Sequence, residues 1–193
     1  VLYIHVTLVP YIQTADELKT KPTQHSVQEL RRIGIQPDIL LCRADRELSE
    51  DIKRKIALFA NMDLRDVATA RDVKSIYELP LLLKDEKIDE RVCAKLGIRA
   101  PKAQLKAWKN FLYSLENANR RLRIGVIGKY VDLKESYKSL NEALIHASAH
   151  VGAKLEIEFI DSEKLENSRF DSIESREKIL GDVDGILVPG GFG

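Results

Sequence analysis

The chain has 193 residues, of which 44% are hydrophobic, so it is long enough for one good core or two small ones. It carries 31 basic and 30 acidic residues, and its net charge of +1 provides no long-range field that would favour nucleic acid or an anionic membrane. Its 10 glycines and 6 prolines are too few for a disordered or fibrous chain. We therefore expect a folded protein that binds neither nucleic acid nor a membrane.

Cysteine usage indicates a reducing compartment. The two cysteines, Cys42 and Cys93, make neither a disulfide framework nor a metal cluster, and Cys42 lies in an apolar run typical of buried positions. No apolar run approaches the roughly 18–20 residues that span a bilayer. These features favour a cytoplasmic location. Because the sequence opens like the middle of a strand and closes on a glycine-rich loop, we expect both ends to be cuts within a longer chain.

Predicted strands and helices alternate through the first part of the chain. Strands are expected at residues 1–9, 39–42 and 67–69. A capping box at residues 26–29 predicts the start of the first helix, which Gly34 ends, and Ser49 predicts the start of the second, with Ile52, Ile56 and Phe59 on its apolar face. Further helical stretches are expected at residues 75–83, at residues 88–96 and from Pro101 onward.

The pattern restarts after a polar, aperiodic run at residues 117–121. A strand at 122–128, a helix at 135–151, a strand at 155–159, a weak helix near 172–180 and a buried strand at 184–188 follow. The expected apolar stripe of the 135–151 helix is Tyr137, Leu140, Leu144, Ala147 and Val151. This β-α-β order implies a parallel sheet with right-handed crossovers. We therefore predict an α/β fold of two units joined near residue 120, with a linker at 117–121.

The run from Lys19 to Gln24 is the most informative local feature. Two lysines, Lys19 and Lys21, stand close to a predicted helix N-terminus, which presents unpaired N–H groups and partial positive charge. Lysine ammonium groups together with these donors can hold an oligophosphate. The run is not a glycine-rich phosphate loop, however, and a solvated loop with two lysines explains the pattern as well.

Three other segments admit a binding role beside a plain structural one. Residues 46–55 mix both signs of charge and are typical of a solvated helix face. Asp72 precedes a predicted helix, where an acid is commonly a cap. Residues 189–193 follow a predicted strand, so their glycines provide either a tight turn or N–H donors for a substrate oxyanion. The four histidines show no spacing typical of metal ligands.

Several long segments resemble the CTP synthases, glutamine-dependent amidoligases that make CTP from UTP. The resemblance covers essentially the whole chain and is carried, in family order, by the segments HVTLVPYI, KTKPTQHSVQELRRIGIQPDILLCR, KIALFAN, DVKSIYELP, GVIGKYVDLKESYKSLNEAL and ILVPGGFG. It implies an α/β amidoligase domain, doubly wound, followed by a class I glutamine amidotransferase domain. Residues 1–116 then match the C-terminal part of the first domain and residues 122–193 the N-terminal part of the second.

The resemblance also implies roles for individual residues. The segment that binds UTP and the inhibitor CTP matches Lys19, Thr20, Lys21, Pro22, Thr23 and Gln24, and a further lysine that contacts the pyrimidine nucleotide matches Lys55. The segment that holds the ATP adenine matches Arg71, Asp72 and Val73, with arginine where the family has lysine, which changes the donor geometry. The glutamine-binding glycine and its neighbour match Gly191 and Phe192.

The resemblance further implies ATP and magnesium as cofactors, GTP as an allosteric activator and a homo-tetramer. The phosphate loop, the magnesium ligands and the Cys-His-Glu residues of the glutaminase have no match, so we expect no catalytic residue in this chain and no activity from it alone. A self-standing, non-catalytic α/β nucleotide-binding protein is the alternative. The sequence that flanks residues 1 and 193 in the encoding locus distinguishes the two.

Overall fold

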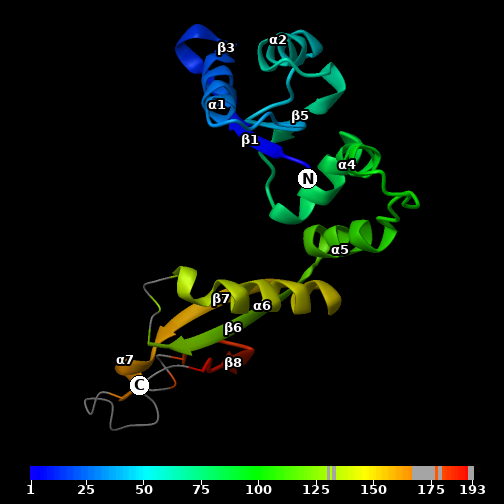
Figure 1. The fold of residues 1–193 in the computed structure, drawn as a ribbon. Helices are drawn as coiled ribbons and strands as arrows, with labels where there is room; N and C mark the ends of the chain where they lie inside the picture. Colours follow the sequence, from blue (N-terminus) through cyan, green and yellow to red (C-terminus); the bar gives the residue numbers. More distant parts are fainter. Residues whose placement is uncertain (130, 132–133, 167–176, 178–179, 191–193) are drawn as a thin grey trace. The chain divides into compact units, whose positions relative to one another are not determined.

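The computed structural model describes residues 1–129, 131, 134–166, 177 and 180–190. The chain divides into two compact units, Val1–Leu105 and Lys106–Gly193 (Figure 1). In each unit parallel strands alternate with helices, which confirms the predicted α/β fold. The predicted linker at 117–121 stays a prediction. Helix α5 (Lys106–Asn117) packs within the second unit, and strand β6 (Arg120–Gly128) follows it closely.

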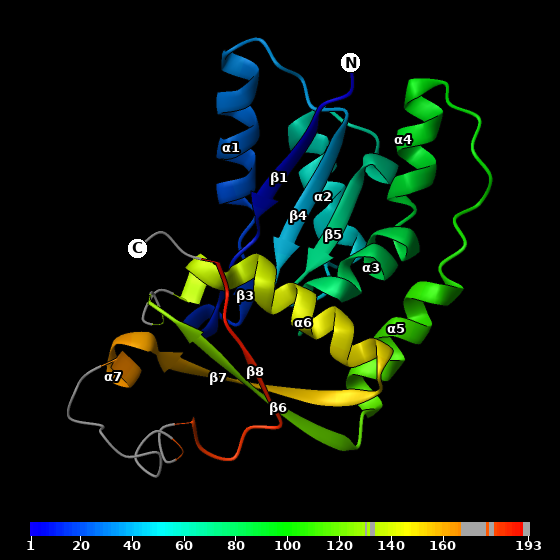
Figure 2. The ribbon, with the colours of Figure 1, turned by 90° about the horizontal axis from the view of Figure 1, so that it is seen from below.

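The first unit is built on three parallel strands in the order β1-β4-β5, and a short antiparallel hairpin, β2–β3, separates β1 from the first helix (Figure 2). Its elements in chain order are β1 (Ile4–Leu8), β2 (Tyr11–Ile12), η1 (Gln13–Ala15), β3 (Glu17–Leu18), α1 (Lys21–Arg32), β4 (Ile39–Ala44), α2 (Glu50–Ala60), η2 (Leu64–Asp66), β5 (Val67–Arg71), η3 (Ile76–Glu78), α3 (Leu79–Asp85) and α4 (Ile88–Leu96).

Helices cover both faces of this sheet, as the doubly wound prediction requires. Successive side chains of a strand point to opposite faces. Leu40, Cys42 and Ala44 therefore pack with Val27 of α1 and with the buried face of α2, while Ile39 packs with the first residue of α4 on the other side. The predicted strand at 39–42 is confirmed as the central strand of the sheet, buried on both faces.

Strand β1 forms one edge of the described sheet and is covered on one face only. His5 and Thr7 face α1, where the His5 ring lies 2.9 Å from the Ser26 hydroxyl. Val6 and Leu8 point to the opposite face, with exposed fractions of 62% and 54%. The helices α3 and α4 pack beside β5 and β4 and do not extend over β1.

Several predicted helix ends are confirmed by the backbone. The Ser49 hydroxyl caps α2 by accepting from the Ile52 N–H at 3.4 Å. Gly34 and Gly97 take the left-handed conformation after α1 and α4, with φ of +89° and +65°. Only glycine adopts this region without steric cost, which explains why these two helices end there.

Two predicted helix starts are wrong. Helix α1 begins at Lys21, before the capping box expected at 26–29, because Pro22 suits the first turn and Ser26 hydrogen-bonds to His5 instead. Helix α5 begins at Lys106 and not at Pro101. The apolar face expected for α2 is also partly wrong, since Phe59 is exposed and Ala57 and Ala60 are buried with Ile56.

Among its described residues the second unit has three parallel strands in the order β7-β6-β8, with α6 packed on β7 and α5 packed on α6. Its described elements are α5 and β6, given above, then η4 (Lys134–Tyr137), α6 (Lys138–His150), β7 (Ala153–Asp161), α7 (Ser162–Glu166) and β8 (Gly185–Leu187). The weak helix predicted near 172–180 lies largely outside the described residues.

Burial in the second unit differs from the sequence expectation. In α6 the buried residues are Ser148 and Ala149, while Ala147 and Val151, expected on the apolar stripe, are exposed. The strand expected to be buried at 184–188 is a short edge strand, and Ile186 and Val188 are exposed.

Candidate functional site

The segment from Lys19 to Gln24 lies at the carboxyl edge of the β1-β4-β5 sheet. Strand β1 ends at Leu8, the hairpin follows, and the Lys19 N–H donates to the Pro10 carbonyl at 2.8 Å, which returns the chain to that edge. Helix α1 begins two residues after Lys19, at Lys21. Lys19 therefore precedes the helix and Lys21 lies in its first turn, beside the N–H groups that have no partner within the helix.

The uncharged residues of this segment anchor it to the sheet. The Thr23 side chain is fully buried, and its hydroxyl donates to the Leu8 carbonyl at 2.9 Å and lies 3.2 Å from the Thr7 hydroxyl. Thr20 is also buried, and its hydroxyl accepts from the Gln24 side-chain amide at 3.1 Å. These contacts fix the start of α1 against the end of β1.

The charged residues of the segment face solvent. Lys19 and Lys21 are exposed, and Lys19 forms an ion pair with Glu17 of β3. The hydrogen bond and the charge of Lys19 lower the pKa of Glu17, and the charge of Lys55 on α2 lowers it further. The charges of Lys19 and Lys55, predicted from separate segments, thus both act on one carboxylate, which only Lys19 contacts. Sequence reasoning missed Glu17, although an acid two residues before Lys19 was a visible signal.

The second predicted segment, Arg71 to Val73, lies at the same edge. Strand β5 ends at Arg71, which is exposed, and the Asp72 N–H donates to the Ala44 carbonyl at the end of β4, at 2.8 Å. The Asp72 carboxylate accepts from Arg43 Nε at 2.7 Å. Asp72 is therefore not a helix cap. Ser75 takes that role, in a capping box with Glu78.

The loop after β4 contacts the hairpin through residues that the sequence had placed on a solvated face. The Arg46 guanidinium lies 3.5 Å from the centre of the Tyr11 ring and is also bonded to Asp45 by two hydrogen bonds, of 2.9 and 3.0 Å. The Tyr11 hydroxyl in turn contacts the Asp16 carboxylate. A cation over an aromatic face is attractive, so this contact holds the hairpin that carries Glu17.

A half-buried polar network lies beside these loops. The Lys53 ammonium pairs with Glu86 at 2.8 Å and with Glu47 at 3.2 Å, and Glu47 accepts from the Thr69 hydroxyl at 2.6 Å. Burial raises the pKa of the nearby Cys42 thiol to about 11. A thiol with such a pKa is protonated at neutral pH, so Cys42 is a packing residue and not a nucleophile.

The predicted glutamine-binding residues, Gly191 and Phe192, lie outside the described residues. The described chain shows β8 in parallel pairing with β6 and continues to Gly190, past the carboxyl end of β8. Within the described residues, no group of three or more His, Cys, Asp or Glu side chains could hold a metal ion. Across that same part of the chain, every helix is too short or too polar to cross a membrane.

The comparisons with known proteins point to one family. The sequence model of the family described as CTP synthase N-terminus matches residues 1–98. A CTP synthase of Bdellovibrio bacteriovorus is 52% identical over 190 residues, which cover 98% of this chain and 34% of that protein. The chain thus spans about a third of the length of this curated relative. Because this family model matches just over half of the chain, and the similarity to the relative extends over nearly all of it, the chain belongs to the CTP synthase family.

Proposed function

We propose that this chain is the part of a CTP synthase that connects its two domains. Residues 1–116 form the C-terminal part of the amidoligase domain, 117–121 the linker and 122–193 the N-terminal part of the glutamine amidotransferase domain. The whole enzyme aminates UTP to CTP at the expense of ATP, with ammonia from glutamine. The similarity to the Bdellovibrio CTP synthase over nearly the entire chain supports this proposal.

We infer that the triphosphate of UTP, or of the inhibitor CTP, binds at the start of α1. The observation that carries this inference is the position of Lys19 and Lys21, exposed at the N-terminus of α1 at the carboxyl edge of the parallel sheet, with the charge of Lys55 acting on the neighbouring Glu17. Ligands of open α/β sheets bind beyond that edge. Glu17 forms an ion pair with Lys19, so phosphate oxygens would have to displace the Glu17 carboxylate from the Lys19 ammonium group. Thr20 and Thr23 would position the segment without touching the phosphates.

Arg71, Asp72 and Val73 are proposed to hold the ATP adenine at the same edge. The bond from Arg43 occupies one oxygen of the Asp72 carboxylate and fixes the backbone of this turn. Adenine would then be read by backbone groups and by the Val73 side chain, with Arg71 free to reach the solvent side. ATP would supply the phosphoryl group that activates the uracil oxygen. The same proposal includes that the whole enzyme uses magnesium, is activated by GTP, assembles as a homo-tetramer and is located in the cytoplasm.

Substitution of the two lysines in the full-length enzyme that carries this chain tests the site. In Lys19→Ala and Lys21→Ala, UTP saturation and CTP inhibition should weaken together, because each charge-assisted contact contributes roughly 1.5–3 kcal/mol. Arg54→Gln is the matched control, since Arg54 adjoins Lys55 on α2 but pairs outward with Glu50 at 2.5 Å. Unchanged UTP and CTP constants in both lysine variants would rule out the assignment.

The glutamine site is tested by Gly191→Ala in the same enzyme. A β-carbon at a glycine whose N–H stabilises an oxyanion should crowd the substrate, and the loss of one such donor typically slows the reaction about a hundredfold to a thousandfold. We expect glutamine-dependent CTP formation to collapse while ammonia-dependent formation stays. If both activities fall together, Gly191 has only a structural role.

A further inference from the structure

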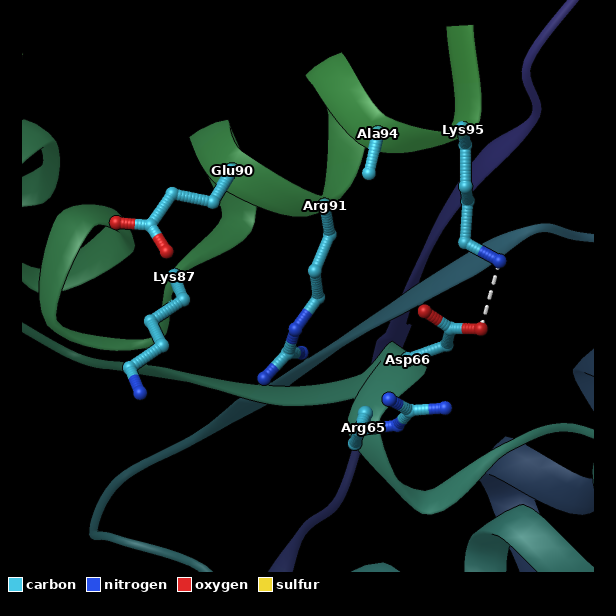
Figure 3. A pocket seen from close by; sticks show the side chains of 7 residues that line it. All are labelled: Arg65, Asp66, Lys87, Glu90, Arg91, Ala94 and Lys95. Carbon is cyan, nitrogen blue, oxygen red and sulfur yellow. Dashed lines mark ion pairs between the residues drawn. The ribbon is translucent and has the colours of Figure 1, made fainter. Parts of the chain in front are cut away.

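A cavity lies at the amino end of the strands of the first sheet, opposite to the proposed nucleotide segments. Its volume is about 460 Å³, and it opens between α4 and the residues that lead into β5 (Figure 3). Arg65 and Asp66 come directly before the first residue of β5, so the cavity lies at the amino edge of that strand, away from the Lys19 and Arg71 segments. The lining residues are Arg65, Asp66, Lys87, Glu90, Arg91, Ala94 and Lys95.

The acidic residues of this cavity already have basic partners. Asp66 is half-buried and pairs with Lys95 at 2.7 Å. Glu90 pairs with Lys84, which lies outside the cavity, at 2.8 Å. Arg65 is held by Asp63, at 2.8 Å. The carboxylates in and around the cavity are therefore engaged, and they do not neutralise its other cations.

Among the residues that line the cavity, Lys87 and Arg91 are the two cations without a carboxylate partner in the described part of the chain. Within the described residues, neither side chain forms an ion pair or a hydrogen bond, and Arg91 Nη1 is a buried donor without a partner. Figure 3 shows Arg91 extending from α4 and Lys87 from the turn before it, with the Arg65 guanidinium across the cavity from α4. A buried guanidinium nitrogen without an acceptor is uncommon in folded proteins. Because Arg91 Nη1 has almost no accessible surface, a ligand in the cavity would meet the other atoms of the guanidinium.

The other cations around the cavity are already paired. Lys95 pairs with Asp66 and Arg65 with Asp63, so an anion in the cavity would bind at Lys87, which immediately precedes α4, and at Arg91. The planar guanidinium fork matches phosphate oxygens in pairs, and a lysine adds a compact second charge.

We propose that this cavity binds the phosphate group of a small molecule, through Arg91 and Lys87. The volume exceeds the needs of a bare phosphate and falls within the range of small-molecule pockets, so a phosphorylated metabolite fits as well as the free ion. The site is separate from the proposed nucleotide segments and does not depend on them.

Nuclear magnetic resonance of the 193-residue chain tests the site directly. Inorganic phosphate is titrated at constant ionic strength against chloride, and the Nε–H signal of Arg91 is identified by its loss in Arg91→Gln. We expect a saturable shift of that signal with phosphate and none with chloride. In Lys87→Gln the phosphate affinity should fall roughly tenfold, which equals about 1.4 kcal/mol. A wild-type signal that does not respond to phosphate would overturn the proposal.

Two control variants separate this site from the nucleotide segment. Arg31 and Lys21 both lie on α1, which packs against β1 at the other edge of the sheet. In Arg31→Gln and Lys21→Gln the response of Arg91 to phosphate should be unchanged, whereas Lys21→Gln should weaken CTP binding if the proposed function is right. A response of Arg91 lost in Lys21→Gln would assign the phosphate to the nucleotide segment and overturn the second site.

Ribose 5-phosphate and ribose distinguish the two sources of phosphate. Tighter binding of ribose 5-phosphate than of phosphate, with no response to ribose, would support a phosphorylated metabolite. Equal affinities would support the free ion. Arg91→Lys keeps the positive charge but not the planar guanidinium. It should bind phosphate more weakly than the wild type but more tightly than Arg91→Gln. If isothermal titration finds full phosphate affinity in a folded Arg91→Gln, the proposal is wrong.

Discussion

Replacing Thr23 by valine should detach the start of α1 from the end of β1. Valine has nearly the same shape but no hydroxyl, so the Leu8 carbonyl loses the donor that lies 2.9 Å away. The Thr23 side chain has an exposed fraction of 0%, which leaves no room for water to replace the bond. A buried polar group left without a partner costs about 1–3 kcal/mol, and we expect the first unit to lose that much stability.

Thiol labelling measures this loss in the first unit alone. Cys42 is buried in the central strand of that unit, and in a Cys93→Ser background its reaction with a thiol reagent reports the unfolding of this sheet. With a urea dependence of about 1–3 kcal/mol per molar, Thr23→Val should lower the midpoint of Cys42 labelling by roughly 1 M. Thr23→Ser keeps the hydroxyl and loses one methyl group, worth about 0.8 kcal/mol. If Thr23→Val is as stable as the wild type, or loses less than Thr23→Ser, the hydroxyl is not the anchor.

Three further outcomes are expected. At pH 8 the native chain should react rapidly at Cys93 only, because burial raises the pKa of Cys42 to about 11; two fast thiols would contradict this. Partial burial raises the pKa of Glu47, but hydrogen bonds from Thr69 and Lys53 outweigh it and leave that pKa lowered, so its stabilising effect is present above the ordinary value of about 4.3 and lost below it. Glu47→Gln should therefore flatten the pH dependence of urea unfolding below about pH 5, and an unchanged slope would refute the shift. Asn61 has a φ of +53° at the end of α2, so Asn61→Ala should cost about 1 kcal/mol in the same measurement and Asn61→Gly should not, whereas equal effects would exclude strain.

The fold could be predicted from the sequence because its signals are local. Continuous apolar runs marked the central strand at Ile39–Ala44, and glycines marked the ends of α1 and α4. The predicted burial of β8 is wrong: Ile186 is exposed, on a strand that is the last of the described sheet. Periodicity describes one element and carries no information about its neighbours.

The candidate site could be predicted only where its residues are contiguous. The run from Lys19 to Gln24 stood out by its lysines, but its helix start was misplaced because Ser26 forms its bond with a distant residue, His5. The contact of Arg46 with Tyr11 joins segments that are far apart in sequence. Such pairings depend on how the strands are ordered, and a single sequence does not reveal that order.

Binding of CTP and of cytidine to the full-length enzyme tests the central claim most directly. If Lys21 at the start of α1 holds the phosphates, Lys21→Gln should weaken CTP binding by roughly tenfold or more, since one charge-assisted contact contributes about 1.5–3 kcal/mol. Cytidine has no phosphates and should bind more weakly than CTP. Its affinity, measured by isothermal titration, should be the same in the wild type and in Lys21→Gln. An equal loss for CTP and cytidine, or no loss for CTP, would contradict the proposed site.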